Sequence, residues 1–122
     1  MTEPLFIYVA GPYTPRGNDI HDAAREANLN VRVAIQIGIE LIKKGHFAFI
    51  PHLTHFIHLE MGDNIALPNT FWYEYDLKWL AKCNALYYIA PSTGANIELK
   101  WAREHGLQVF HELHNVPDVS KK

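Results

Sequence analysis

Short apolar runs alternate along this chain with longer segments of helical periodicity. The runs lie at residues 5–10, 47–50, 85–90 and 107–110, and Gly11-Pro12, Pro51 and Pro91 interrupt the chain after the first three. Apolar runs of this length fit strands that are buried on both faces, as in a parallel sheet. The alternation predicts an α/β fold of the flavodoxin or Rossmann type, with three layers and a doubly wound parallel sheet of four to five strands.

The segments between these runs predict the helices. Apolar residues recur every three or four positions from Ala24 to Ile42, which indicates a long helix that ends at Lys43-Lys44-Gly45. Residues 69–82 and 95–105 have helical patterns as well, and residues 52–68 are expected to form a loop with local helical structure over a site. The tail, residues 116–122, is expected to be frayed.

Composition narrows the classes of partner. The 122 residues, 48% of them hydrophobic, suffice for one core, so residues 1–122 are taken as a single domain. The net charge of −2 and the lack of a basic run before Lys121-Lys122 argue against nucleic acid or a membrane as partner and favour a small molecule. The single cysteine, Cys83, excludes an internal disulfide, and the N-terminus has no secretory pattern, so we expect a cytoplasmic protein.

The segment that follows the third apolar run contains a candidate nucleophile. Its pattern is S-x-G-x-x-x-E, from Ser92 to Glu98. If a helix begins here, Glu98 is expected in its first turn, where the helix dipole keeps the carboxylate ionised. Ser92 and Thr93, with the N–H groups of Gly94 and Ala95, can hold a 5′ hydroxyl or a phosphate; simple N-capping is the alternative, and the commoner role, for each of the two side chains.

Asp76 is the second candidate. Its neighbours at three and four positions are Trp72, Tyr73, Trp79 and Leu80, so Asp76 lies on an apolar stripe of the predicted helix. Burial among aromatic rings raises the pKa of a carboxyl group and allows it to carry a proton near neutrality. A structural aspartate that caps a backbone or pairs with an arginine is the alternative. Two carboxyl groups in such different environments suit retaining glycosyl chemistry.

Four motifs in order resemble those of the nucleoside 2-deoxyribosyltransferase superfamily, which includes 2′-deoxynucleoside 5′-phosphate N-hydrolases. They are Y-V-A-G-P-Y at residues 8–13, Gly45-His46, Asp76-Leu77 and the S-x-G-x-x-x-E segment. The resemblance implies that Glu98 is the nucleophile, that Asp76 serves the leaving base and that Ser92 contacts the 5′ end of the sugar. It also implies a pocket formed by Gly11 and Tyr13 and a homodimer or larger oligomer, with no cofactor.

Two other interpretations compete with this one. His52, His55 and His58 recur at intervals of three, but three ligands on one metal would require a bent or non-helical segment, so we expect no metal. A non-catalytic nucleotide-sensing module could use the same crevice, because fold alone does not define activity. Such a module has no use for a nucleophile at Glu98, and the paired carboxyl groups therefore favour an enzyme.

The sequence leaves the substrate open within this class. The sequence does not define the preferred base. It also does not distinguish ribose from 2-deoxyribose, or water from a second base as the acceptor. At the 5′ end, Arg16 lies on the loop after the first run and favours a phosphate over a hydroxyl.

Overall fold

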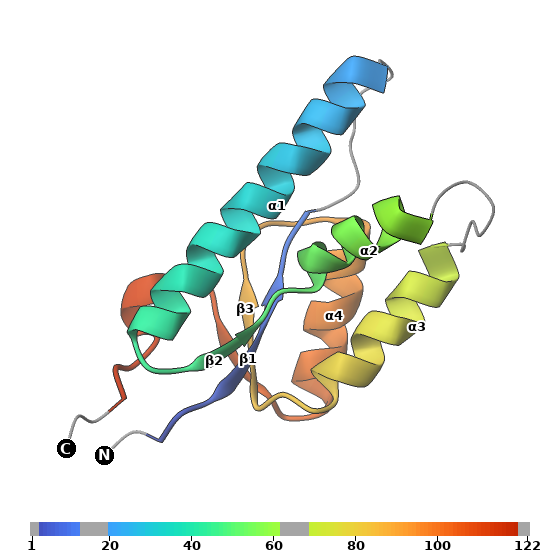
Figure 1. Ribbon diagram of the computed structural model, residues 1–122. Helices are drawn as coiled ribbons and strands as arrows, with labels where there is room; N and C mark the ends of the chain where they lie inside the picture. Colours follow the sequence, from blue (N-terminus) through green and yellow to red (C-terminus); the bar gives the residue numbers. More distant parts are fainter. Residues whose placement is uncertain (1–2, 13–19, 62–68, 120–122) are drawn as a thin grey trace.

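The computed structural model describes residues 3–12, 20–61 and 69–119 (Figure 1). It contains a sheet of four parallel strands in the order β2-β1-β3-β4. The strands are β1 (Phe6–Ala10), β2 (Phe47–Phe49), β3 (Ala85–Tyr88) and β4 (Gln108–Phe110). All four arise from the predicted apolar runs, and the predicted α/β class with a parallel sheet is confirmed.

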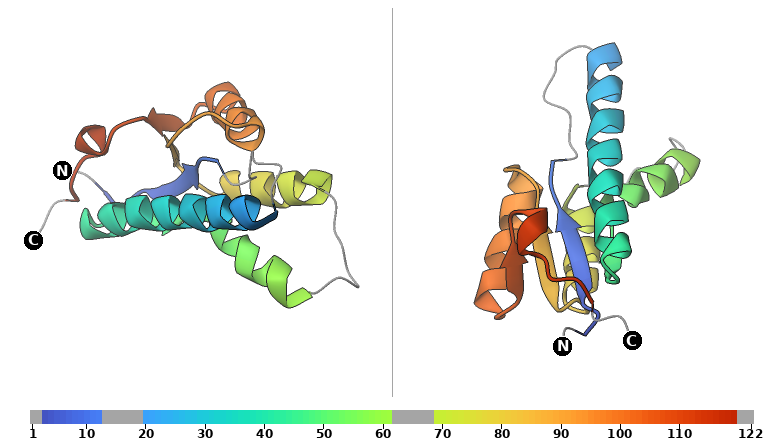
Figure 2. Two further views of the ribbon diagram at one scale, coloured as in Figure 1. Left: turned by 90° about the horizontal axis from the view of Figure 1, so that it is seen from above. Right: turned by 90° about the vertical axis from the view of Figure 1, so that its left-hand side faces the viewer.

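Helices connect the strands and cover both faces of the sheet. They are α1 (Ile20–Lys43), α2 (Thr54–Met61), α3 (Asn69–Leu80) and α4 (Thr93–Glu104), with short 3₁₀ turns η1 (Pro51–Leu53) and η2 (Leu113–Asn115). Figure 2 shows α1 on one side of the strands and α4 on the other, which gives the three layers of the predicted architecture. In the described ranges, no helix combines the length and the apolar character needed to cross a bilayer.

The strand order places a topological switch between β1 and β3. The chain passes from β1 through α1 to β2 at one edge, and then returns across β1 through α2 and α3 to β3. Ala10 pairs with Tyr88 in the β1–β3 register, so the carboxyl ends of the two central strands lie side by side. In open α/β sheets, ligands bind in the crevice at such a point.

Strand β1 divides the core into two parts because successive side chains point to opposite faces. Ile7 and Val9 pack with Ala34 and Leu41 of α1. Tyr8 and Ala10 instead face the layer formed by α3 and α4, together with Leu80, Leu86, Ala95 and Ala102. The α1 side is a mainly aliphatic cluster, whereas the opposite side includes a tyrosine hydroxyl at its centre.

The C-terminal tail packs against the rest of the protein at residues 116–119, so the predicted fraying over residues 116–122 is wrong for these four; residues 120–122 lie outside the described ranges. Val116 is buried, and the Val119 N–H donates to the Lys44 carbonyl at 2.8 Å. Gly45 has φ +96°, and a β-carbon there would lie only 2.8 Å from the Val119 side chain. No local sequence pattern signals this contact, because it joins segments that are far apart in the chain.

Buried His46 ties the same tail to the start of the sheet. Its Nδ1 accepts the Leu5 N–H at 3.1 Å, and its Nε2 lies 2.6 Å from the Pro117 carbonyl. Since Nδ1 is the acceptor, Nε2 carries the proton and donates it to Pro117. The imidazole therefore links both ends of the described chain.

The segment after β2 contains more helix than the sequence predicts. In place of a loop with local helical structure over residues 52–68, the structure has η1 followed by the eight-residue helix α2. Residues 62–68 lie outside the described ranges.

Candidate active site

Ser92 caps helix α4. Its backbone is extended, with φ −162° and ψ 167°, and its hydroxyl oxygen accepts the Ala95 N–H at 3.0 Å. The Ser92 carbonyl accepts the Asn96 N–H at 2.9 Å. The N-capping interpretation therefore describes Ser92 in this structure, and the Ala95 N–H, a candidate donor to a phosphate, is already bonded.

Glu98 lies in the second turn of α4, not in the first turn as predicted. The helix begins at Thr93 and has no acidic residue in its first turn. Because the influence of the helix dipole falls off within the first turn, it does not hold Glu98 in the ionised form. The spacing in S-x-G-x-x-x-E places Glu98 beneath the helix start, against the sheet.

Burial dominates the electrostatics of Glu98. Only 9% of the residue is exposed, and the Tyr8 hydroxyl donates to its Oε2. Burial raises the pKa of Glu98 to about 8; the Tyr8 hydrogen bond lowers it, and the nearby Asp76 charge raises it. The prediction that the dipole keeps Glu98 ionised is therefore wrong, and its charge depends on the surrounding side chains.

Tyr8 supplies the hydrogen-bond donor of this site. It lies in the middle of β1 and is fully buried, and its pKa is raised well above its ordinary value by burial and then by the charges of Glu98 and Asp76. The phenol therefore stays neutral and donates. From the sequence, Tyr8 was predicted only as part of the Y-V-A-G-P-Y motif and not as a site residue. Its hydroxyl group, within an otherwise apolar run, is the feature that could have identified it.

Asp76 of α3 has the raised pKa that its apolar surroundings predicted. Burial raises the pKa of Asp76 to about 7. Its Oδ1 is buried and has no hydrogen-bond partner among the described residues. Since Asp76 influences both Tyr8 and Glu98 electrostatically, the three side chains form one group, defined here as the carboxyl pair with its tyrosine.

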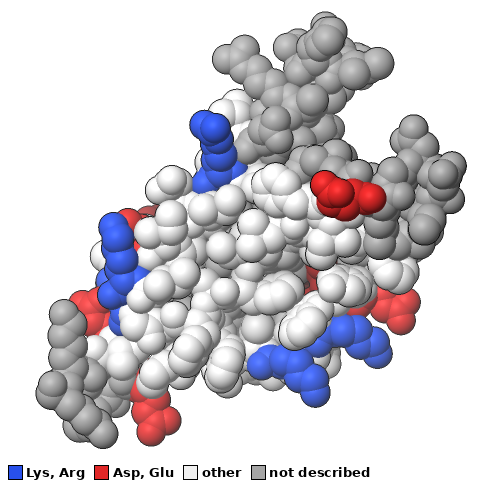
Figure 3. Space-filling model, in the orientation of Figure 1, with Lys and Arg blue, Asp and Glu red and all other residues white. Residues whose placement is uncertain are grey.

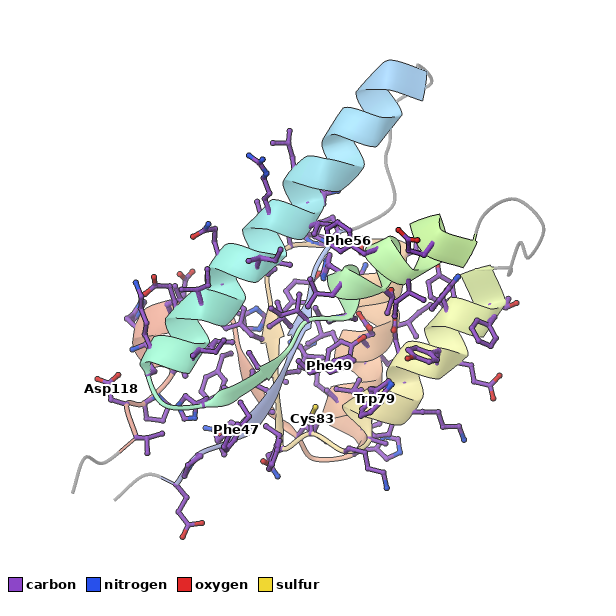
Figure 4. All side chains as sticks on the ribbon, viewed as in Figure 1. Phe47, Phe49, Phe56, Trp79, Cys83 and Asp118 are labelled. Atoms are coloured by element: carbon purple, nitrogen blue, oxygen red, sulfur yellow. The ribbon has the colours of Figure 1, made fainter. Side chains whose placement is uncertain are left out.

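Aromatic rings stack beside Tyr8 on the β2 side. Phe49 stacks on Tyr8 with ring centroids 5.6 Å apart, and on Trp79 of α3 at 5.2 Å. Figure 4 shows Phe49 and Trp79 close together between β2 and α3. The low polarity of these rings is consistent with the raised pKa values of both carboxyl groups.

Gly11 and His52 shape the end of β1. A β-carbon on Gly11 would lie 3.0 Å from Ile89, so this turn approaches β3 closely. His52 Nε2 lies 3.2 Å from the Gly11 carbonyl and 3.1 Å from the Pro12 carbonyl, and it must carry a proton because both partners are acceptors. Burial lowers the pKa of His52, which favours the neutral imidazole.

The other predicted residues are placed only in part. Tyr13 and Arg16 lie outside the described residues, as do the side chains of His55 and His58. Within the described ranges, no three histidine, cysteine, aspartate or glutamate residues form a group that could hold a metal ion. Burial raises the pKa of Cys83 to about 11, which disfavours a thiolate nucleophile.

No protein-family model matches the chain, and no curated protein matches it. The chemistry of the site therefore has to be argued from its geometry. Two carboxyl groups that titrate near neutrality, one of them bonded to a neutral phenol, can together provide a nucleophile and a proton donor.

Proposed function

We propose that the protein cleaves the N-glycosidic bond of a nucleoside or a nucleoside 5′-monophosphate through a covalent glycosyl-Glu98 intermediate. The observation that carries this proposal is the pair of buried Glu98 and half-buried Asp76, on the adjacent helices α4 and α3, with Glu98 bonded to Tyr8 of β1. Retaining glycosyl transfer needs one carboxylate as nucleophile and a second carboxyl as proton donor. The resemblance in sequence motifs assigns the same two residues to these roles.

The reaction has two steps. In the first, a Glu98 carboxylate oxygen forms a bond to C1′ while the bond from C1′ to the base nitrogen breaks, and the Asp76 proton passes to the departing base. In the second, water or another base attacks C1′ and displaces Glu98, and the Asp76 carboxylate takes up the proton released by the attacking group. Both residues thereby return to their starting states.

The protonation states of the pair suit this scheme. Burial raises the pKa of Asp76 to about 7 and that of Glu98 to about 8, so the pair can retain a proton near neutral pH. The reaction needs that proton on Asp76 and an ionised Glu98, which is the productive arrangement of the pair.

Two interactions favour the productive arrangement. Tyr8 donates to Glu98 and stabilises its ionised form. In the transition state, positive charge develops on the sugar, and an ionised Glu98 beside C1′ stabilises it further. Among the described residues, Asp76 Oδ1 has no hydrogen-bond partner, and it is the oxygen from which the proposal has the base receive its proton.

Release of free base from a panel of nucleosides and 5′-monophosphates, followed by chromatography, tests the proposal. We expect release by wild type and a loss on the order of 10³-fold or more in Glu98→Gln, which keeps the size of the side chain but removes its nucleophilicity. Mass spectrometry of quenched wild-type enzyme should show a sugar adduct that the variant lacks. Undiminished release by Glu98→Gln, or binding of nucleotides with no release by wild type, would contradict the proposal, and the second result would favour the nucleotide-sensing alternative.

The panel also decides the 5′ end of the substrate. The sequence favoured a phosphate, but Ser92 already occupies the Ala95 N–H in this structure. A higher kcat/KM for monophosphates than for nucleosides would support the phosphate, and the reverse would support a bare hydroxyl.

A further inference from the structure

Two residues of α3 lie opposite two residues of α4. Both helices run away from the carboxyl edge of the sheet, because each precedes or follows a strand of the same parallel sheet, and they lie side by side (Figure 1). On α3, Tyr73 and Asp76 are three residues apart and share a face; on α4, Gly94 and Glu98 are four apart and also share a face. Asp76 and Glu98 influence each other electrostatically.

Tyr73 of α3 and Gly94 of α4 are in contact with each other. A β-carbon built on Gly94 would lie 3.3 Å from Tyr73 Cε1, so the Tyr73 ring rests against the backbone of Gly94. The ring therefore stands one helical turn from the carboxyl pair, on the side of the carboxyl edge where a ligand enters. Gly94 allows this approach because it has no side chain.

Tyr73 differs from the other aromatic residues of its helix. Phe71, Trp72 and Tyr75 form a cluster with ring centroids 5.2 to 6.0 Å apart, and Trp79 stacks on Phe49. Tyr73 is half-buried, yet within the described residues its ring stacks on no other ring and its hydroxyl has no hydrogen-bond partner. Asp76 Oδ1, one turn along the same face, is likewise without a partner among them.

We propose that Tyr73 is a base-binding residue whose ring packs against the planar base of the substrate. This inference rests on the proposed function, in which Asp76 donates its proton to the leaving base. Since Tyr73 shares a helix face with Asp76, it lies beside the base, while Glu98 on the facing helix lies beside the sugar. An aromatic face recognises any planar heterocycle by stacking, and the phenol hydroxyl adds a donor and an acceptor for its edge.

The experiment compares Tyr73→Leu with Tyr73→Phe and with the control Tyr75→Leu, which removes a neighbouring ring of the Phe71 and Trp72 cluster on the same helix. Calorimetry measures the dissociation constants of free purine and pyrimidine bases, and steady-state kinetics give KM and kcat for the nucleosides that wild type cleaves. Melting curves confirm that each variant is folded. The binding measurement needs no turnover, so it tests Tyr73 separately from the proposed reaction.

We expect Tyr73→Leu to weaken base binding and to raise KM by about tenfold, with kcat changed much less, because loss of one stacked base contact has this size. Tyr73→Phe should retain most of the affinity, and Tyr75→Leu should resemble wild type. Gly94→Ala should give a smaller loss than Tyr73→Leu because it displaces the ring by only a few tenths of an ångström.

Equal effects of Tyr73→Leu and Tyr75→Leu, or a fall in kcat with unchanged base affinity, would overturn the inference, as would wild type that binds no base. If wild type binds bases through Tyr73 but releases none from any nucleoside, the proposed reaction fails while the base-binding role of Tyr73 is supported.

Discussion

The two faces of the sheet use the same strand for different purposes. On the α1 face, Ile7 and Val9 pack into a cluster whose buried members are mainly aliphatic. On the opposite face, Tyr8 contacts a buried glutamate. One step along β1 thus separates side chains that only stabilise the fold from one that alters the ionisation of a carboxyl group, because alternate residues of a strand enter different environments.

The two faces also differ in how they satisfy buried polar groups. The buried His46, at the edge of the α1 face, has a defined partner on each ring nitrogen. On the α3 and α4 face, Asp76 Oδ1 lacks a partner among the described residues, and two carboxyl groups have raised pKa values. Buried polar groups that lack a partner, or carboxyl groups with a raised pKa, lower the stability of the fold and are found where a protein binds or transforms a ligand.

Figure 3 shows lysine, arginine and acidic side chains mainly around the margin of the face that it displays, with other residues across its middle.

Leu41→Ala should have the largest effect on stability, because it removes a buried side chain from the cluster on the α1 face. Leu41 is fully buried, and its truncation is expected to lower the free energy of unfolding by about 3 kcal/mol, as for other buried leucines. Denaturant unfolding measures the loss. Because Leu41 lies away from the carboxyl pair, folded Leu41→Ala protein should keep the pH dependence of base release; a displaced pH profile would show that the two faces are coupled.

Glu98→Gln should change stability in a pH-dependent way. An unfolded glutamate ionises near pH 4.5, whereas burial raises the folded pKa to about 8, so between these values the unfolded state binds fewer protons and wild-type stability falls as pH rises. The variant lacks this contribution. A difference of one in pKa between the folded and unfolded states corresponds to about 1.4 kcal/mol. We therefore expect the loss of unfolding free energy between pH 5 and pH 8 to be smaller in Glu98→Gln than in wild type, by about 2 kcal/mol or more.

Urea titrations of wild type and Glu98→Gln at several pH values test this expectation. Glu104→Gln, an exposed glutamate of the same helix, is the matched control. Parallel pH profiles for all three proteins would mean that Glu98 ionises as easily in the folded as in the unfolded state.

Asp76→Asn should have the most selective effect. If Asp76 protonates the leaving base, the variant should lose about 10²-fold in kcat/KM for poor leaving groups and much less for activated ones, because a good leaving group needs little proton transfer. A series of nucleosides with bases of graded acidity measures this dependence. A uniform loss across the series would assign Asp76 to positioning or structure rather than to proton transfer.

Local sequence patterns determined most of the fold. Apolar runs closed by Gly11-Pro12, Pro51 and Pro91 predicted the strands, and the three-to-four periodicity predicted α1, α3 and α4, because these signals depend on residues close together in the chain. The same periodicity placed Asp76 on an apolar stripe and predicted the direction of its pKa change correctly. The parallel direction of the strands followed from the long connections between them, although the exact extent of α2 did not.

The charge of Glu98 and the order of the tail were decided only by the tertiary structure. The helix position alone suggested an ionised glutamate, but packing beneath Tyr8 and beside Asp76 raised its pKa to about 8. The tail likewise is held by Lys44 and His46, which come from the other half of the chain. Both outcomes depend on desolvation and hydrogen bonds between residues distant in sequence, and these interactions exist only once the sheet and its helices have assembled.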